Sequence, residues 1–401
     1  MGRTLKLPTC AMSIPTATST TTPPTTTMRR ARSDESRGRV THVKAEPISK
    51  RVYVPSERIK NMTNQEIITD FNNLYRAFKR SQNNRSYTRS SMYFQIDAVT
   101  KIREIQKTLI DHSFKCGGYA EFTVYYPKER IIKACRFKDK IVQHVLCDNI
   151  LVKAYPNICI TDNYAGQKGK GTSSGLNRTK DQILKFCSEH KNGYFYKGDI
   201  HKYYYNIDHE TAKDIMHYHY PKDIWWLIDE FIDSTEGDAG IALGNQINTV
   251  VSNLYLDGMD KFITQDLGIT YYGRYADDFR LIHESKEYLK YCVECIEEYL
   301  HTLKLELNPK SQISTLSCGI SFLGFHFSYK NNELVIKVDN GKKRAYRRKF
   351  NKLCKKVKNG ELPLEVLEKS YKSWSEHASF ATDKSIFDYY IRRIKELKND
   401  N

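Results

Sequence analysis

Two adjacent aspartates between two apolar runs constrain this chain more than any other feature. Asp277 and Asp278 follow residues 269–275 and precede residues 279–283, and both flanking runs are rich in β-branched and aromatic residues. This pattern predicts a strand, a tight turn and a second strand, with the two acids at the tip of the hairpin. Because side chains alternate between the faces of a strand, neighbouring carboxylates can converge on one site only where a turn interrupts the alternation.

A third acid upstream completes a set that suits divalent metal ions. Asp199 lies at the end of another short apolar segment, in the run Lys197, Gly198, Asp199, Ile200. Three carboxylates can cage two Mg²⁺ ions that activate a hydroxyl and hold the leaving oxygen of a phosphoryl transfer. The alternative is that the Asp-Asp pair is only a polar hairpin turn. The other motifs of the chain favour the metal site.

The charge balance points to a polyanionic partner. The 401 residues carry 64 Lys and Arg against 47 Asp and Glu, which gives a net charge of +17. Because cations that neutralise phosphates release condensed counterions, nucleic acid is the expected partner. An anionic membrane surface is the competitor, but no uninterrupted apolar run reaches about 18 residues, so we expect no membrane association.

The ten cysteines are scattered and favour a reducing, cytoplasmic setting. The one close pair, Cys292 and Cys295, lies in a helical pattern over residues 288–303. A structural zinc site would need a second ligand pair at suitable spacing, and none follows. We therefore expect packed thiols in a helix.

Composition divides the chain into three parts. Residues 1–61 are a Thr-, Pro- and Arg-rich extension that we expect to be disordered. A transit peptide, or an untranslated leader before a start at Met62, are alternatives for this segment. Thr63 is a candidate cap for a helix over residues 64–78, where an ordered domain begins. Mixed strands and helices continue to residue 330, and residues 331–401 are helical and basic at their start.

Two segments could contact phosphates. Residues 126–144 alternate cations with apolar residues and include Lys128, Arg130 and Lys133, which could lie against a triphosphate, although a solvated edge strand has the same alternation. The Gly-rich loop 164–172 can bring backbone amides near phosphate, with a flexible turn as the alternative. This loop lacks the Walker pattern.

An aromatic residue follows Asp199 at short range. Tyr204 could exclude a ribose 2′-hydroxyl by its bulk, and a core tyrosine is the alternative. Asp208 is a second acid in this segment, but its context is typical of a helix N-cap. Farther on, a glycine turn at residues 240–244 leads into an apolar helix over residues 250–262 and allows close approach of backbone to a base pair or phosphate.

The start of the C-terminal region is strongly basic. Between residues 342 and 358, apolar side chains recur on one helical stripe and cations occupy most other positions. Such a helix can follow a duplex backbone without reading its sequence, and a solvated helix face is the alternative. The cations that we expect to contact the nucleic-acid backbone are Lys342, Lys343, Arg344, Arg347, Arg348 and Lys352.

Taken in order, these segments resemble the successive motifs of a bacterial reverse transcriptase, from about residue 62 to the end. The subgroups that the chain resembles are the group II intron-like enzymes, the enzymes of diversity-generating retroelements, and unassigned or defence-associated reverse transcriptases. The resemblance implies an α+β, right-hand polymerase fold. Fingers and a palm with an antiparallel sheet packed on helices would occupy residues 62–330, and a helical thumb would occupy residues 331–401.

The resemblance also implies residue roles. The residues implied to hold two Mg²⁺ ions, with Mn²⁺ as a substitute, are Asp199, Ile200, Asp277 and Asp278. The residues implied to contact the incoming dNTP are Lys128, Arg130, Lys133, Tyr204, Leu243 and Gly244. The residues implied to grip the primer end are Phe322, Leu323 and Gly324. Lys310 would protonate the departing pyrophosphate.

Several departures from the family pattern bear on the subgroup. Leu243 stands where retroviral and intron enzymes usually have Gln, as an aliphatic residue does in diversity-generating enzymes, and we expect reduced fidelity. Asn248 and Thr249 occur where that subgroup usually has Ser-Gln, and Lys140 replaces a common arginine. The retron Val-Thr-Gly signature is absent, and no endonuclease domain with His and Cys clusters follows.

The implied function is RNA-directed DNA polymerisation, in which a primer 3′-hydroxyl attacks the α-phosphate of a dNTP. The implied partners are an RNA template, a DNA or RNA primer and dNTPs, with an accessory protein or a dedicated structured RNA as further candidates. One alternative is untemplated or protein-primed DNA synthesis in phage defence. Another is a non-catalytic RNA-binding scaffold, which the presence of Asp199, Asp277 and Asp278 disfavours.

Overall fold

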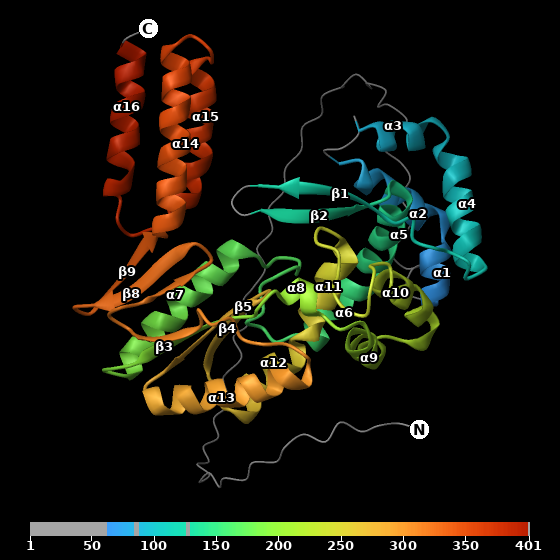
Figure 1. Cartoon of the computed structure of the whole chain (residues 1–401), viewed down its shortest axis with the longest axis horizontal. Coiled ribbons are helices and arrows are strands. Elements are labelled where there is room, and N and C mark those ends of the chain that lie inside the picture. The colour runs from blue at the N-terminus through green and yellow to red at the C-terminus, as the bar shows by residue number, and fades with distance from the viewer. Residues whose placement is uncertain (1–61, 84–87, 126–128, 400–401) are drawn as a thin grey trace, which may run out of the picture. The chain divides into compact units, whose positions relative to one another are not determined.

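The computed structural model describes residues 62–83, 88–125 and 129–399, in which helices are combined with antiparallel sheets (Figure 1). The expected α+β class is therefore confirmed. The predicted N-terminal extension, residues 1–61, lies outside the described residues, and so does Lys128.

Helices and strands are interspersed along the chain. The helices are α1 (Asn64–Thr69), α2 (Phe71–Ser81), α3 (Arg89–Ile96), α4 (Ala98–Ile110), α5 (Phe137–Leu146), α6 (Val152–Ile158), α7 (Thr172–Glu189), α8 (Tyr203–Asn206), α9 (His209–His219), α10 (Trp225–Ile232), α11 (Gln246–Tyr255), α12 (Asp257–Lys261), α13 (Lys286–Thr302), α14 (Asn340–Lys358), α15 (Leu364–Ala378) and α16 (Asp388–Asn399). The strands are β1 (Tyr119–Val124), β2 (Arg130–Cys135), β3 (Tyr194–Asp199), β4 (Tyr271–Tyr275), β5 (Asp278–His283), β6 (Gln312–Thr315), β7 (Ile320–Phe322), β8 (Phe325–Lys330) and β9 (Glu333–Val338).

The central sheet has the strand order β4-β5-β3-β6, and all of its neighbours are antiparallel. Strands β4 and β5 form the hairpin that the sequence predicted, with Tyr275 opposite Asp278 and a turn of two residues between them. Strand β3 pairs with β5 so that Asp199 lies opposite Asp278. The register of one sheet thus brings the three predicted acids to one end.

The central sheet buries a different core on each face, because its side chains alternate. On one face, Tyr196 and Phe279 join a core with α13, and on the other face Phe195 and Ile282 join a core with α7. Figure 1 shows α13 and α7 on opposite sides of the sheet. Asp199 and Asp278 occupy the α7 face, since they lie an even number of residues from Phe195 and Ile282.

A second sheet, β7-β8-β9, joins the C-terminal helices in a shared core. Phe322 and Phe327 of this sheet belong to the same buried cluster as Phe350 of α14 and Tyr390 of α16. The predicted domain boundary at residue 330 falls inside this sheet, at the turn between the paired strands β8 and β9. Fingers, palm and thumb as separate units remain a prediction.

The first predicted helix is two helices. The predicted cap at Thr63 is confirmed, and it is part of a capping box, in which the Thr63 side chain accepts from the Glu66 amide while the Glu66 side chain accepts from the Thr63 amide. The expectation of one continuous helix over residues 64–78 was wrong, because Asp70 adopts an extended conformation and caps α2 through the Asn73 amide. An N-cap residue needs a non-helical backbone, so it interrupts the helix.

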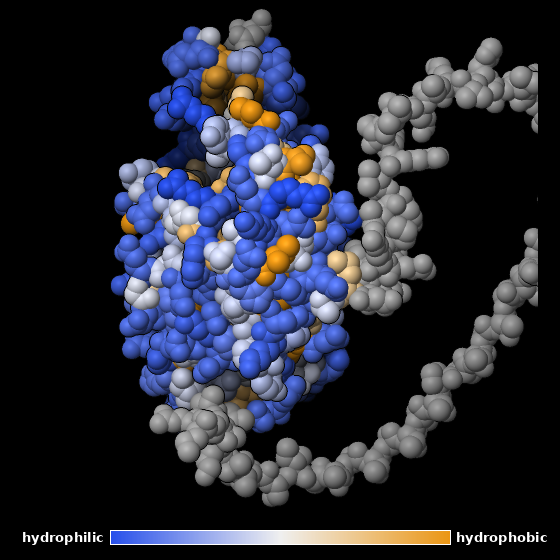
Figure 2. Space-filling model, turned by 90° about the vertical axis from the view of Figure 1, so that its right-hand side faces the viewer, coloured by the Kyte–Doolittle hydropathy of each residue, from blue (hydrophilic) through white to orange (hydrophobic). Residues whose placement is uncertain are grey.

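The apolar helix predicted for residues 250–262 is also divided, because it is formed by α11, which starts at Gln246, and by the short α12. The helix with the Cys292–Cys295 pair is confirmed as α13. The face of the molecule in Figure 2 is mostly hydrophilic, with separate hydrophobic patches. Among the described residues, no helix is long and apolar enough to cross a membrane.

Candidate active site

Asp277 and Asp278 are presented by the turn of the β4–β5 hairpin. Ala276 and Asp277 form the turn, and Asp278 is the first residue of β5. Ala276 has a φ of 55°, a left-handed conformation that alanine rarely adopts. The surrounding structure must therefore hold this turn in place.

Asp199 ends β3 and is held by a segment more than a hundred residues away. The Asn308 side chain donates from Nδ2 to Asp199 Oδ2 at 2.9 Å, and the Asn308 backbone amide donates to the Asp199 carbonyl at 2.7 Å. The Asp199 amide donates to Ser311 Oγ at 3.2 Å. Before it, Gly198 is required by packing, because a Cβ there would collide with the Phe279 ring.

The carboxylates influence one another electrostatically. Burial raises the pKa of Asp278 to about 7, the Lys197 ammonium acts to lower it, and the charges of Asp199 and Asp277 raise it. Burial also raises the pKa of Asp277, and Asp199 contributes in the same direction. Lys197 Nζ lies 3.3 Å from Asp278 Oδ1, so the chain itself supplies a cation to this cluster.

The acids suit divalent metal ions by their chemistry, although they do not form a closed cage. In the part of the chain that the structure describes, no group of three or more His, Cys, Asp and Glu side chains is arranged to hold a metal ion. Carboxylate oxygens are nevertheless the ligands that Mg²⁺ prefers. Because Asp277 and Asp278 have raised pKa values beside Asp199, a cation at this place would stabilise their charged forms.

Of Arg130 and Lys133, the two predicted dNTP-contacting cations of β2 that the structure describes, Arg130 is related to the acids. It begins β2, and its charge acts to lower the pKa of Asp277. Lys133 lies on the opposite face of β2 by strand alternation, and its ammonium pairs with Glu121 at 3.3 Å. Sequence alternation alone did not separate these two roles.

Tyr204 lies near Asp277, and the glycine turn adjoins Tyr204, because the Ile241 amide donates to the Tyr204 carbonyl at 2.9 Å. Tyr204 is half-buried in α8, and its pKa is raised by burial and then by the charge of Asp277. Gly244 has a φ of 98° in the turn before α11, where Leu243 is half-buried. A Cβ on Gly244 would lie 3.7 Å from the Ile132 side chain, on the same face of β2 as Arg130. Arg130 and Tyr204 therefore lie within electrostatic reach of Asp277, and the glycine turn lies against β2.

The predicted primer-grip residues form the β7–β8 hairpin. Phe322 pairs with Phe325, which leaves Leu323 and Gly324 as the turn, with φ values of 50° and 86°. Positive φ at both residues is typical of a type I′ turn. Leu323 packs toward Gly175 of α7, and the Lys342 side chain covers Gly324.

The remaining predicted cations are exposed. Lys310 lies two residues beyond Asn308, and its amide donates to the Asn308 side chain at 3.1 Å. All six cations of α14 that were predicted to contact the nucleic-acid backbone are exposed, namely Lys342, Lys343, Arg344, Arg347, Arg348 and Lys352. The Arg347 guanidinium lies 4.3 Å from the centre of the Tyr389 ring. These cations form one basic helix surface.

Two sequence features serve the fold. In the Gly-rich loop, the Lys170 ammonium donates to the carbonyls of Thr161 and Asn163 at 2.8 and 3.1 Å, so it is tied to the loop itself. Asp208 is the N-cap of α9, as its context indicated, because its side chain accepts from the Thr211 amide at 3.0 Å.

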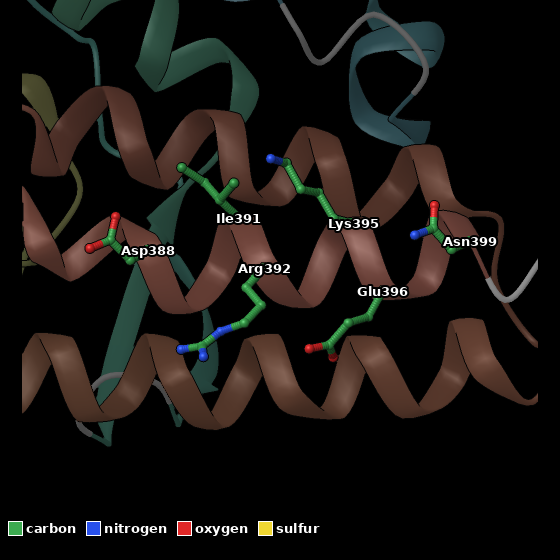
Figure 3. A pocket seen from close by; sticks show the side chains of 6 residues that line it. All are labelled: Asp388, Ile391, Arg392, Lys395, Glu396 and Asn399. Atoms are coloured by element: carbon green, nitrogen blue, oxygen red, sulfur yellow. The ribbon is translucent and has the colours of Figure 1, made fainter.

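A hollow of about 400 Å³ lies along α16 (Figure 3) and contains none of the predicted site residues. It is lined by Asp388, Ile391, Arg392, Lys395, Glu396 and Asn399. Two acids and two bases line this helix face, so the hollow selects no single charge and takes no part in the candidate site.

Three residues beside the acids were missed as site residues by reasoning from the sequence. Asn308 donates to Asp199, and Lys197 pairs with Asp278. Arg274 donates to the carbonyl of Ala276 in the turn. The sequence signal for them was weak. Lys197 and Arg274 are single charges inside apolar strands, a pattern that solvent-facing strand positions share.

Comparison with known proteins finds similarity of two kinds, to a family model and to solved structures. A family model described as reverse transcriptase (RNA-dependent DNA polymerase) matches residues 126–327, about half of the chain. Among solved structures, a chain of telomerase from Candida albicans, solved with a fragment of telomeric RNA, is similar with 12% identity and a TM-score of 0.44. The similarity covers 70% of this chain and 59% of the telomerase chain. A search of curated proteins finds no match.

Proposed function

Because this chain belongs to the reverse transcriptase (RNA-dependent DNA polymerase) family, we propose that it extends the 3′-hydroxyl of a DNA or RNA primer with dNTPs on an RNA template. Its mixed helices and antiparallel sheets have the right-hand polymerase fold. In this proposal the enzyme is a nucleotidyltransferase that forms a phosphodiester bond and releases pyrophosphate.

The observation that carries the proposal is the meeting of Asp199, Asp277 and Asp278 at one end of the central sheet. Asp199 and Asp278 are register partners in β3 and β5, and Asp277 adjoins them in the turn. A polar turn without a function would not need a third acid opposite it. The cost of burying neighbouring carboxylates makes such a cluster unfavourable without positive charge, and the Lys197 ammonium supplies a single charge against three carboxylates.

We propose that these three carboxylates, with the backbone oxygen of Ile200, hold two Mg²⁺ ions, for which Mn²⁺ is a substitute. Bound Mg²⁺ in such a site supplies activation of a hydroxyl nucleophile and stabilisation of charge on phosphate oxygens. The chain's own residues would do the positioning. Asn308 orients Asp199, Arg130 would contact the triphosphate, and Tyr204 would exclude the 2′-hydroxyl of a ribonucleotide.

The remaining predicted residues complete this proposal. Leu243 and Gly244 would lie against the nascent base pair, and the Leu323–Gly324 turn would hold the primer end. Lys310 would donate a proton to the departing pyrophosphate, a role that its exposed position permits. The six predicted cations of α14, all of them exposed, would follow the backbone of the template–primer duplex, a role that suits a helix surface with this density of positive charge.

Primer extension tests the proposed function directly. The full chain would be incubated with a primed RNA template, Mg²⁺ and dNTPs, beside the double variant Asp277→Asn/Asp278→Asn. We expect cDNA whose sequence follows the template, and no product from the variant. Product that ignores the template would favour untemplated or protein-primed synthesis. RNA binding without any product in either protein would favour a scaffold.

For the biological role, we propose only a relation to known reverse transcriptase subgroups, a location and a further partner. The aliphatic Leu243 supports a relation to diversity-generating reverse transcriptases, and group II intron-like and defence-associated enzymes are the other subgroups that the motifs resemble. We propose a cytoplasmic location, supported by the free thiols of Cys147, Cys292 and Cys354. An accessory protein or a structured RNA would be a further partner.

A further inference from the structure

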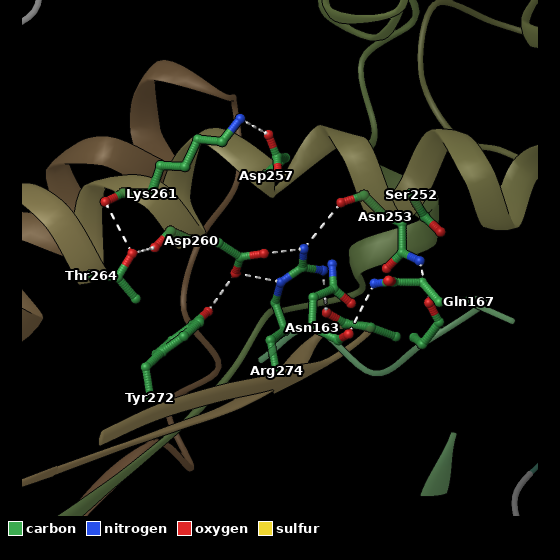
Figure 4. A network of polar contacts seen from close by, with 12 residues as sticks. Asn163, Gln167, Ser252, Asn253, Asp257, Asp260, Lys261, Thr264, Tyr272 and Arg274 are labelled. Atoms are coloured by element: carbon green, nitrogen blue, oxygen red, sulfur yellow. Dashed lines mark hydrogen bonds and ion pairs between the residues drawn. The ribbon is translucent and has the colours of Figure 1, made fainter. Parts of the chain in front are cut away.

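A buried ion pair between Arg274 and Asp260, drawn in Figure 4, adjoins the turn that carries Asp277 through a hydrogen bond to Ala276. Arg274 of β4 pairs with Asp260 of α12 through two bonds of 2.6 Å, from Nε to Oδ1 and from Nη2 to Oδ2. Both side chains are 0% exposed. The Tyr272 hydroxyl donates to the same carboxylate at 2.6 Å. Asp260 therefore binds three donors and fixes the plane of the guanidinium.

The remaining guanidinium nitrogen reaches the turn itself. Nη1 of Arg274 donates to the carbonyl of Ala276 at 3.0 Å, and Nη2 also donates to the carbonyl of Asn253 at 3.0 Å. Ala276 is the residue with the left-handed φ of 55°. One planar group thus joins the strained turn to Asn253 of α11 and Asp260 of α12, which Figure 4 shows beside Arg274.

The backbone of Arg274 is held as firmly as its side chain. Its amide donates to the carbonyl of Asp162 at 2.9 Å, and its carbonyl accepts from the Tyr164 amide at 3.0 Å. These bonds form a parallel bridge between β4 and the start of the Gly-rich loop. The Arg274 backbone is therefore held in place. Any movement of the turn must stretch the hydrogen bond from Arg274 Nη1 to the Ala276 carbonyl.

Stability alone is a poor reason for this arrangement. A buried ion pair often stabilises a fold no better than well-packed apolar residues would, because both charges lose their hydration. A strained backbone conformation, in contrast, persists only where its surroundings over-determine it. The guanidinium suits that task, since its planar fork presents several donors in fixed directions, whereas a lysine offers one nitrogen.

We propose that Arg274, oriented by Asp260, is a positioning residue that fixes Asp277 and Asp278 relative to Asp199. This inference rests on the proposed polymerase function. Arg274 touches neither substrate nor the reacting atoms in this role, because it acts through the carbonyl of Ala276. The effect of losing it should appear in the chemical step and in metal binding, with little effect on nucleotide binding.

The test compares Arg274→Lys with Tyr272→Phe in the full chain. Lysine keeps a cation beside Asp260 but cannot serve both Asp260 and Ala276, whereas Tyr272→Phe removes a bond to the same carboxylate and leaves the bond to the turn. For Arg274→Lys we expect kcat of primer extension to fall by about 10- to 100-fold, with the KM for dNTP unchanged. Tyr272→Phe should retain the wild-type kcat.

Two readouts do not depend on polymerase activity. Mn²⁺ binding, measured by electron paramagnetic resonance of the free ion, should weaken by about tenfold or more in Arg274→Lys. Amide hydrogen exchange of residues 271–279 should become faster in Arg274→Lys and stay unchanged in Tyr272→Phe. If the wild-type chain extends no primer, the proposed function fails, while these two measurements still decide the positioning role.

Several results would overturn the inference. One such result is that Arg274→Lys binds Mn²⁺ and exchanges its amide hydrogens as the wild type does. Another is that Arg274→Lys and Tyr272→Phe lose kcat and Mn²⁺ affinity equally. If Arg274→Lys does not fold, the double variant Arg274→Gln/Asp260→Asn, which removes both charges together, takes its place. If neither Arg274→Lys nor the double variant folds, the Arg274–Asp260 ion pair serves only the stability of the fold, and the positioning role is overturned as well.

Discussion

Replacing Asn308 by alanine tests whether catalysis depends on how Asp199 is held. The Asn308 side chain donates to Asp199 Oδ2 at 2.9 Å, and its backbone amide separately donates to the Asp199 carbonyl at 2.7 Å. Alanine removes the first bond and keeps the second. The backbone conformation at Asp199 and Asn308 should therefore stay the same, while the Asp199 carboxylate becomes free to rotate.

The size of the effect follows from the kind of bond that is removed. A hydrogen bond to a charged group contributes roughly 1.5–3 kcal/mol to stability. Because Asn308 and Asp199 are both half-buried, water can partly replace the amide, and the lower end of about 1.5 kcal/mol applies. If this energy is removed from the transition state, the rate of nucleotide incorporation falls about tenfold.

Single-turnover incorporation of one dNTP, followed by rapid quench, separates the rate of the chemical step from nucleotide affinity. For Asn308→Ala we expect the lower rate with unchanged dNTP affinity and a higher Mg²⁺ requirement. Asn206→Ala is the matched control, because Asn206 donates its side-chain amide to the His201 carbonyl at 3.1 Å and does not hold Asp199. An unchanged rate in Asn308→Ala at every Mg²⁺ concentration, or the same loss in Asn206→Ala, would refute the reasoning.

Three further predictions concern substrate choice and binding. Tyr204→Val should increase ribonucleotide incorporation relative to dNTP incorporation, measured by competition, because the smaller side chain leaves room for a 2′-hydroxyl; no change in this ratio would contradict the steric role. Leu243→Gln should lower misincorporation, measured by sequencing the cDNA, and an error frequency as high as that of the wild type would remove the link to fidelity. The double variant Arg344→Gln/Arg347→Gln should bind a template–primer duplex more weakly, and the slope of log affinity against log salt should fall by about 0.9 for each phosphate that the variant no longer neutralises. An unchanged salt slope would mean that this face of the helix does not bind the nucleic acid.

The sequence alone predicted the local elements of the site. The β-branched and aromatic runs around Asp277 and Asp278 give the β4–β5 hairpin, because strand preference depends on residues near one another in the chain. The caps at Thr63 and Asp208 are local for the same reason, since each side chain binds an amide three residues onward. The sequence-based prediction was wrong where one residue could extend a helix or cap the next, as at Asp70.

The tertiary structure decided which of these local elements meet, and with which partners. Asn308 reaches Asp199 across 109 positions, and Arg274 reaches Asp260 from a strand that looks apolar in the sequence. Lys133 and Lys170, cations in predicted phosphate-binding segments, instead bind Glu121 and loop carbonyls. A single charge in an apolar run has the same local pattern whether it faces solvent, a buried acid or a substrate. Strand register and helix packing choose among these partners, because both are set by contacts between segments that are distant in the chain.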